Sequence, residues 1–219
     1  MADLKQFEHH TDWQIIQEIL AGKTALFELL IRRNNPFLYK TGRSCNYSRE
    51  DTEDLMQETF ISAYAALPKF ENRSSFRTWI IRIMLNKCHR RREKLSFSKE
   101  QAGEKAINEN AIPMYSSEHS DTGKAVANKE LRHVIENALS RVPEEYRLVF
   151  SLREISGLNV AETAEALEIS EANVKTRLSR AKNMLRKEIE KTYTAEELFG
   201  FNLVYCDAMV ERVMSRIKS

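Results

Sequence analysis

Apolar residues that recur every three or four positions constrain the fold of this 219-residue chain more than any other feature. Leu131, Val134, Ile135, Ala138 and Leu139, for example, follow the spacing that places side chains on one face of a helix. Glycine and proline, which interrupt helices and build turns, number only 6 and 4. The sequence therefore predicts an all-α protein rather than a turn-rich β-fold.

The first part of the chain, residues 1–95, contains a series of such patterns. The predicted helices cover 13–30, 37–43, 48–67 and 76–94. Gly22 is a possible break in the first of these helices, and Pro36 stands just before the second, as expected near a helix start. Ser74 or Ser75 can cap the last helix.

Charge is distributed unevenly along these helices, although the net charge of the whole chain is only +2. The helix over 48–67 has an acidic start, with Glu50, Asp51, Glu53, Asp54 and Glu58. The helix over 76–94 has a basic face, with Arg77, Arg82, Lys87, Arg90, Arg91, Arg92 and Lys94. Local clusters of opposite sign, rather than the total charge, therefore indicate which partners the chain can bind.

The middle of the chain has a different composition. Residues 96–128 are rich in Ser, Asn, Glu, Lys and Ala and have no sustained periodicity, which predicts a flexible linker. The helical pattern then resumes, with Pro143 typical of a first helical turn and Gly157 typical of a helix C-terminus. A second helical domain is expected over 129–191, followed by an amphipathic C-terminal extension over 192–219.

The segment from Asn159 to Leu185, NVAETAEALEISEANVKTRLSRAKNML, has the pattern of two helices joined by a tight corner. Asn159 and Glu162 have the spacing of a capping box, and Ser170 can cap the second helix. At the corner, Glu168 stands where glycine would adopt a left-handed backbone more easily. The pattern favours a helix-turn-helix, but a plain helical hairpin with a solvated cationic face has the same spacing.

The second helix of this pair has an outer face suited to the major groove of DNA. Residues near its N-terminus would contact base edges, and the cations that follow would neutralise phosphates. The outer face includes Glu171, Asn173, Lys175, Thr176, Arg177, Ser179 and Arg180. A regulator that uses only this helix-turn-helix, and that binds duplex DNA tightly by itself, is an alternative interpretation.

Two stretches of the chain together resemble one known family. The second conserved region of extracytoplasmic-function (ECF) sigma factors is closely similar to residues 51–93, which read DTEDLMQETFISAYAALPKFENRSSFRTWIIRIMLNKCHRRRE. The fourth region of the same family resembles residues 142–187, which read VPEEYRLVFSLREISGLNVAETAEALEISEANVKTRLSRAKNMLRK. The resemblance covers residues 12–191 and keeps the order of two helical domains with a variable linker between them.

The resemblance implies a bacterial transcription initiation factor that is not an enzyme and requires no cofactor. Such proteins bind the β′ and β subunits of core RNA polymerase, direct it to particular promoters, and help to open the −10 element. The implied fold is a sigma-2-like domain over 1–95 and a sigma-4-like helix-turn-helix domain over 129–191, which reads the −35 element. The implied partners are core polymerase, promoter DNA and an anti-sigma factor that holds the protein inactive.

The acidic helix start matches the family's contact to the β′ coiled coil of the polymerase. Clustered acids suit a basic partner helix and repel DNA. Acids are also favoured at a helix N-terminus by its dipole, but that effect does not explain Gln57 and Glu58. The expected polymerase contacts are Asp51, Asp54, Leu55, Gln57 and Glu58.

The polar loop over 69–75 matches the family's loop that captures a flipped base of the −10 element, although an ordinary connecting loop has the same composition. The expected −10 contacts in this loop and on the next helix are Asn72, Arg73, Ser74, Ser75, Arg77, Arg82, Asn86, Arg90 and Arg91. Phe76 and Trp79 could stack on bases, but their spacing with Ile80 favours packing in the core. The expected −35 contacts are the outer-face residues named above.

Other classes of protein fit the sequence less well. The carboxylates over 50–58 have no second set of metal ligands, and no nucleophile elbow, P-loop or HExxH motif is present. Cys45, Cys88 and Cys206 are far apart, which predicts reduced thiols in a cytoplasmic protein. No apolar run is long enough to cross a membrane, and the N-terminus lacks the pattern of a secretion signal. A protein that binds only other proteins would need neither the basic face of the helix over 76–94 nor that of the second helix of the helix-turn-helix.

Overall fold

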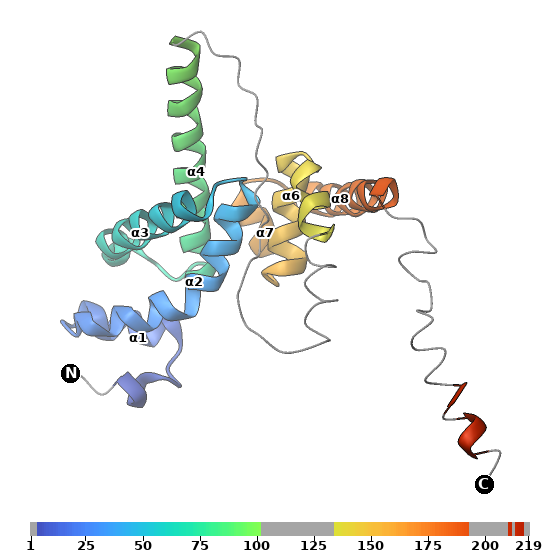
Figure 1. The fold of residues 1–219 in the computed structure, drawn as a ribbon. Helices are drawn as coiled ribbons and strands as arrows, with labels where there is room; N and C mark the ends of the chain where they lie inside the picture. The colour runs from blue at the N-terminus through green and yellow to red at the C-terminus, as the bar shows by residue number, and fades with distance from the viewer. Residues whose placement is uncertain (1–3, 102–133, 193–209, 212, 217–219) are drawn as a thin grey trace.

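The computed structural model describes residues 4–101, 134–192, 210–211 and 213–216, and their regular structure is helical throughout (Figure 1). The first part contains η1 (Leu4–Phe7), α1 (Asp12–Leu20), η2 (Thr24–Leu26), α2 (Phe27–Ser44), α3 (Arg49–Ala66), η3 (Leu67–Lys69) and α4 (Phe76–Gln101). The second part contains helical residues 134–141, then α6 (Glu144–Phe150), the π-helical turn η4 (Ser151–Ile155), α7 (Val160–Leu167) and α8 (Glu171–Thr192). The prediction of an all-α fold is confirmed.

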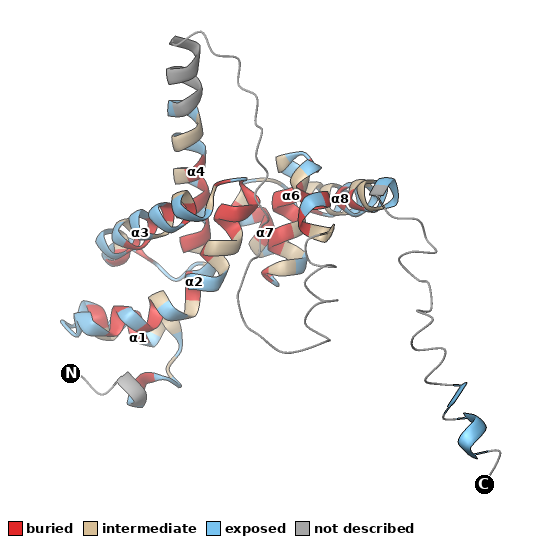
Figure 2. Cartoon of the chain, viewed as in Figure 1, coloured by how far each residue is buried: buried red, intermediate tan, exposed pale blue. Residues whose placement is uncertain are grey.

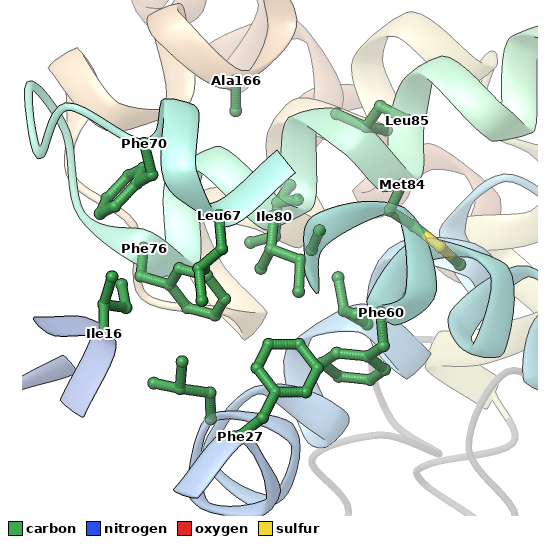
Figure 3. Packing of buried hydrophobic residues seen from close by; sticks show 14 of the residues in the cluster. Ile16, Phe27, Phe60, Leu67, Phe70, Phe76, Ile80, Met84, Leu85 and Ala166 are labelled. Carbon is green, nitrogen blue, oxygen red and sulfur yellow. The ribbon is translucent and has the colours of Figure 1, made fainter. Parts of the chain in front are cut away.

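The core of the first part lies between α2, α3 and α4, and α1 packs beside the start of α2. Figure 3 shows Phe27, Phe60, Leu67 and Ile80 pointing into this core from α2, α3, η3 and α4. A fully buried side chain of this size contributes about 2 kcal/mol through the hydrophobic effect. The apolar residues that recur at helical spacing in the sequence therefore pack into one core between three long helices.

The aromatic residues around the 69–75 loop belong to the core, as their spacing predicts. The ring of Phe70 lies 5.9 Å from that of Phe76 and 5.0 Å from that of Trp79. Phe76 is buried, and Trp79 is partly buried against the same cluster. These rings pack against one another at the two ends of the loop and so belong to the core of the first part.

Pro36 lies inside α2 rather than at the start of a new helix, so the predicted boundary at this position is wrong. A proline inside a helix removes one backbone hydrogen bond and costs about 3 kcal/mol. Helix α2 has buried residues on both sides of Pro36, with Leu30 and Leu38 both at 0% exposure. Between them, the buried amide of Asn34 donates to the carbonyl of Leu30 at 2.8 Å. Packing of the whole helix therefore outweighs the local preference of proline.

Gly42 allows α2 to approach α3 and α4 closely. A Cβ atom at this position would lie 2.6 Å from Cγ2 of Thr52 and 2.8 Å from Cε of Met84. Both distances are shorter than van der Waals contact, and Thr52 and Met84 are fully buried. The contact between these three helices therefore depends on the absence of a side chain at Gly42.

Replacement Gly42→Ala is expected to lower the free energy of unfolding by about 1–2 kcal/mol. Overpacking of the core costs about 1–3 kcal/mol, which exceeds the gain of up to about 1 kcal/mol in helix propensity. Urea denaturation followed by circular dichroism measures the difference. The second change Thr52→Ser removes the clashing methyl group and should restore part of the loss, and a G42A variant as stable as the wild type would contradict the prediction.

The helices of the second part enclose two small cores. One contains Val149, Ala164 and Val174, from α6, α7 and α8. The other contains Leu139 and Val142, next to Leu185 of α8. Four further residues belong to the same buried cluster as the first part of the chain, and these are Leu148, Leu152, Leu158 and Ala166. Figure 2 shows the buried residues of α2, α6 and α7 meeting at the centre of the molecule.

Parts of the sequence predictions fall outside the described residues. Helix α4 continues to Gln101, past residue 95, and the rest of the predicted linker is not described. Most of the predicted extension over 192–219, including Cys206, is also outside the described residues. None of the helices in the described part of the chain is long and apolar enough to span a membrane.

The described cysteines, Cys45 and Cys88, are buried free thiols that lie next to each other, although they are far apart in the sequence. A hydrogen bond with Cys88, together with burial, raises the pKa of the Cys45 thiol well above its ordinary value. This thiol therefore stays protonated at neutral pH, which makes it a poor nucleophile.

Candidate interaction surfaces

Helix α3 presents an acidic surface, which we define as Glu50, Glu53, Asp54, Gln57 and Glu58. Ser48 caps the helix, because its hydroxyl oxygen accepts a hydrogen bond from the amide of Asp51 at 3.0 Å. The cap fixes where the helix begins and therefore which side chains face outward. All members of the acidic surface are exposed, so that they are available to a basic partner.

Two of the predicted polymerase contacts do not belong to this exposed surface. Leu55 is only 1% exposed and packs in the core, so it offers almost no surface to a partner. Asp51 is half-buried, and its carboxylate is 2.6 Å from the guanidinium of Arg91 on α4. Asp51 and Arg91, predicted to contact different partners, thus contact each other. Glu58 remains exposed and lies 3.6 Å from Lys87.

The acidic surface continues into apolar residues that the sequence reasoning missed. Ile61 is 71% exposed and Tyr64 is 41% exposed, both on α3. Tyr64 fits the apolar spacing of a core position, but its ring packs on Phe27 at the rim of the core, with a centroid distance of 5.0 Å. Exposed large apolar side chains next to a charged surface are typical of a protein interface. In the sequence, this apolar contact is indicated by Ile61, because a residue three positions after Glu58 lies on the same side of the helix.

The loop before α4 exposes polar side chains between two fixed ends. Asn72 has a left-handed backbone with φ of 53°, a conformation that asparagine tolerates better than most residues. Arg73 pairs with Glu71 at 2.5 Å. Ser75 caps α4, since its hydroxyl accepts a hydrogen bond from the amide of Thr78 at 3.1 Å. Asn72, Arg73 and Ser75 are exposed, whereas Ser74 is half-buried.

Helix α4 exposes Arg77, Arg82, Asn86 and Arg90, which we call its basic face; Arg82, Asn86 and Arg90 lie along one side of the helix, and Arg77 lies on the opposite side near its start. The guanidinium of Arg77 stacks over the ring of Phe37, 3.8 Å from its centroid, which fixes the orientation of this arginine. Of the predicted −10 contacts on α4, Arg91 faces Asp51. The loop leads directly into α4, so its polar side chains lie next to the start of the helix that carries these cations.

Helices α7 and α8 form the predicted helix-turn-helix. The capping box is present, because the amide of Glu162 donates to Asn159 at 2.9 Å and the amide of Asn159 donates to Glu162 at 2.8 Å. The corner residue Glu168 has a left-handed backbone with φ of 55°, as the tight turn requires. Ser170 accepts a hydrogen bond from the amide of Asn173 at 3.2 Å and so begins α8.

The outer face of α8, which we call the recognition face, is exposed at Glu171, Lys175, Thr176, Ser179 and Arg180. Asn173 and Arg177 are half-buried. Arg177 pairs with Glu145 of α6 at 3.0 Å, so its charge is already compensated within the chain. The exposed cations of this face are therefore Lys175 and Arg180, near the N-terminal half of the helix.

The comparison with protein families gives two matches in chain order. Residues 30–97 match the model for Sigma-70 region 2, and residues 132–185 match the model for Sigma-70, region 4. The ECF RNA polymerase sigma factor SigW of Bacillus subtilis is 32% identical over 146 residues, which cover 64% of this chain and 75% of the relative. The chain belongs to the ECF sigma factors.

Other relatives of this sigma factor match over more of its length. The ECF RNA polymerase sigma-E factor of Haemophilus influenzae is 27% identical over 194 residues, covering 84% of this chain and 97% of the relative. Two solved structures share the fold. CnrH, in complex with the cytosolic domain of CnrY, has a TM-score of 0.60 with 23% identity, over 83% of this chain and 99% of that chain. RpoE of Bartonella quintana, solved with the anti-sigma factor NepR, has a TM-score of 0.63 with 21% identity, over 75% and 96%.

Membership of this family defines the function of the protein. This ECF sigma factor binds core RNA polymerase and directs it to specific promoters, where it takes part in initiation of transcription. Its region 2 includes α3 and α4, and its region 4 includes the helix-turn-helix. The three surfaces described above can therefore be compared with the tasks that a sigma factor performs.

Proposed function

We propose that the three surfaces divide the work of this sigma factor between them. The observation that carries the proposal is the separation of charge on adjacent helices, with acids exposed on α3 and cations exposed on α4 and α8. An acidic surface attracts a basic protein helix and repels DNA, whereas a cationic face attracts the phosphate backbone. Polymerase and promoter DNA would thus be bound on different sides of the same small domain.

The acidic surface of α3, together with Ile61 and Tyr64, is the proposed docking site for the β′ subunit. Its charged residues supply fast and selective association, and the apolar residues supply burial of surface area. Asp51 contributes indirectly, since its pairing with Arg91 helps to hold α3 against α4. Leu55 supports the helix from inside the core.

The loop and the basic face of α4 are the proposed contacts with the −10 element. Asn72, Arg73, Ser74 and Ser75 provide hydrogen-bonding groups for an extruded base, and Arg77, Arg82, Asn86 and Arg90 face the backbone of the opened strands.

Helix α8 is the proposed reader of the −35 element. Glu171, Lys175, Thr176, Ser179 and Arg180 reach base edges and phosphates, while Asn173 and Arg177 lie at the edge of this contact.

We further propose that the protein acts in the cytoplasm, has no catalytic activity of its own, and is controlled by an anti-sigma factor. The chemistry of polymerisation belongs to the core enzyme. Support for an anti-sigma partner comes from RpoE of Bartonella quintana, which was solved with the anti-sigma factor NepR. The polymerase and DNA surfaces of this chain are the sites that such an inhibitor would need to cover.

Run-off transcription tests the proposed function. Core polymerase is incubated with a pool of genomic promoter fragments, with and without the purified protein. Transcripts that start downstream of a shared pair of −35 and −10 sequences should appear only when the protein is present. An alternative outcome, no transcription but tight binding of duplex DNA by the protein alone, would instead support a stand-alone regulator.

A further inference from the structure

The exposed apolar side chains of this protein are concentrated on two helices. Six large apolar side chains are exposed among the described residues, and five of them lie on these helices. Two, Ile61 and Tyr64, belong to α3, and three belong to helical residues 210–211 and 213–216, which we call the C-terminal helix. Figure 1 shows the C-terminal helix apart from the other helices. Exposed apolar faces of this kind are typical of binding sites.

The C-terminal helix has an apolar face and an excess of cations. Its exposed apolar side chains are Val210, Val213 and Met214, at 52%, 49% and 43% exposure. These positions follow the spacing i, i+3, i+4, which places them on one side of a helix. Residues 210–219 contain three cations and one acid, which are Arg212, Arg216, Lys218 and Glu211. A helix of this composition is complementary to a surface that is both apolar and acidic.

Helix α3 presents such a surface along one side. Asp54, Glu58, Ile61 and Tyr64 follow one another at spacings of three or four residues, so they lie in one row. The row is acidic toward the start of the helix and apolar toward its end, where Ile61 is 71% exposed. A helix that covers the whole row must therefore be basic at one end and apolar at the other.

The C-terminal helix matches this row in one orientation. Residues three apart in any α-helix are separated by about 4.5 Å along its axis. An antiparallel helix with Val213 on Ile61 therefore has Val210 at the level of Tyr64. The same alignment has Arg216 at the level of Glu58. In a parallel helix the arginine would instead face the apolar end of the row and the valine its acidic end, so apolar groups and charges match only in the antiparallel orientation.

Attachment to the same chain favours this occupant of α3 over a separate protein. The seventeen residues 193–209 lie between α8 and the C-terminal helix. At about 3.4 Å per residue, a segment of this length can span at most about 58 Å. A compact chain of 219 residues has a diameter of about 45 Å, so the segment is long enough to reach α3. A linker of this size also gives an effective concentration of about 1 mM.

We propose that the C-terminal helix docks on α3 of its own chain and covers the surface to which polymerase binds. The docking rests on the exposed faces and charges of the two helices, and its effect on polymerase rests on the proposed function of α3. A contact with a Kd of about 0.1 mM would cover α3 in about 90% of the molecules at an effective concentration of about 1 mM. Polymerase must then displace the C-terminal helix, which lowers its apparent affinity about tenfold.

The distance between two spin labels on the full chain measures the docking. One label replaces Glu28, next to Phe27, whose ring lies 5.0 Å from that of Tyr64. The other label replaces Glu211, an exposed residue of the C-terminal helix. Cys206 is changed to serine in every sample, and the buried cysteines are left unchanged. Pulsed electron paramagnetic resonance should show a main population of short distances, which is lost when core polymerase is added.

A charge in the apolar face should release the C-terminal helix. Val213→Asp places a carboxylate in the centre of the proposed contact and should lower the short-distance population at least about fivefold. Ser215→Asp adds the same charge to the same helix, on the side opposite to the apolar face, and is the matched control. Its distances should equal those of the unsubstituted labelled chain.

A charge exchange tests the antiparallel orientation. Arg216→Glu should lower the short-distance population only about two- to threefold, because an exposed ion pair contributes little. Addition of Glu58→Arg to this variant should restore the population, since the two charges then attract again. The restoration is read from the distance alone, because Glu58 belongs to the proposed polymerase surface.

Affinity for core polymerase, measured by fluorescence anisotropy, gives the functional readout. Val213→Asp should bind about tenfold more tightly than Ser215→Asp, because α3 is then uncovered. Weaker binding by Val213→Asp would overturn the proposal, since the C-terminal helix would then be part of the polymerase contact.

Two results of the distance measurement would also overturn the proposal. One is an equal distribution in Val213→Asp and Ser215→Asp. The other is a short distance that appears only at high protein concentration, which would mean docking on a second copy of the chain. Loss of the short distance in Val213→Asp with unchanged polymerase affinity would confirm the docking and contradict the proposed function of α3.

Discussion

The double variant Asp54→Lys and Glu58→Lys is expected to lose at least about 100-fold in affinity for core polymerase. Both side chains are exposed on α3, one turn apart, so that they face the same partner. Reversal of their charge replaces two attractions with two repulsions, and placing like charges together at an interface costs several kcal/mol. Fluorescence anisotropy of the labelled sigma factor, titrated with core polymerase, measures this loss.

The matched control is the double variant Glu8→Lys and Glu28→Lys. It changes the net charge by the same amount at exposed positions outside α3. Its affinity should stay within about twofold of the wild type, because distant exposed charges are screened by salt. Equal affinities of the two double variants would refute the assignment of α3 to polymerase, provided that both unfold at the wild-type temperature.

The double variant Lys175→Ala and Arg180→Ala is expected to weaken binding of the holoenzyme to promoters that contain a −35 element by about 30-fold. Both residues are exposed on the recognition face, and each contact with a base or phosphate contributes about 1 kcal/mol or more. The dependence of log affinity on log salt concentration should also become shallower by about two, since two cations no longer displace counterions.

A DNA probe that carries only an opened −10 element provides the control for this experiment. The same variant should bind that probe as the wild type does, because α4 and its loop are unchanged. Arg177→Ala should have a smaller effect than either Lys175→Ala or Arg180→Ala, since Arg177 is paired with Glu145. An equal loss on both probes would mean that α8 supports the fold of the protein rather than recognition of the −35 element.

Local signals in the sequence predicted the helix-turn-helix accurately. The capping box of Asn159 and Glu162 and the cap at Ser170 are properties of a few neighbouring residues, and the structure contains each of them. The start of α3 at Ser48 and that of α4 at Ser75 were predictable for the same reason. Caps are reliable because the orphan amides of a helix start must find an acceptor nearby.

Features that depend on distant parts of the chain could not be predicted in this way. Periodicity places Leu55 and Tyr64 on apolar positions of α3, but only the packed helices show that the first is buried and the second exposed. The sequence predicts a helix boundary at Pro36, and only the burial of α2 on both sides of this residue explains why the helix continues through it. The pairing of Arg82 with Glu168 joins residues far apart in the sequence, and no local pattern predicts it.

The acids exposed on α3 also affect how strongly the protein binds DNA of random sequence. A genome offers about 10⁶ or more non-specific sites, which attract any protein with an excess of cationic side chains. Acids next to the cations of α4 repel the phosphate backbone and keep the net charge of the chain at +2, so they weaken this binding. A larger fraction of the protein would then stay free to meet polymerase.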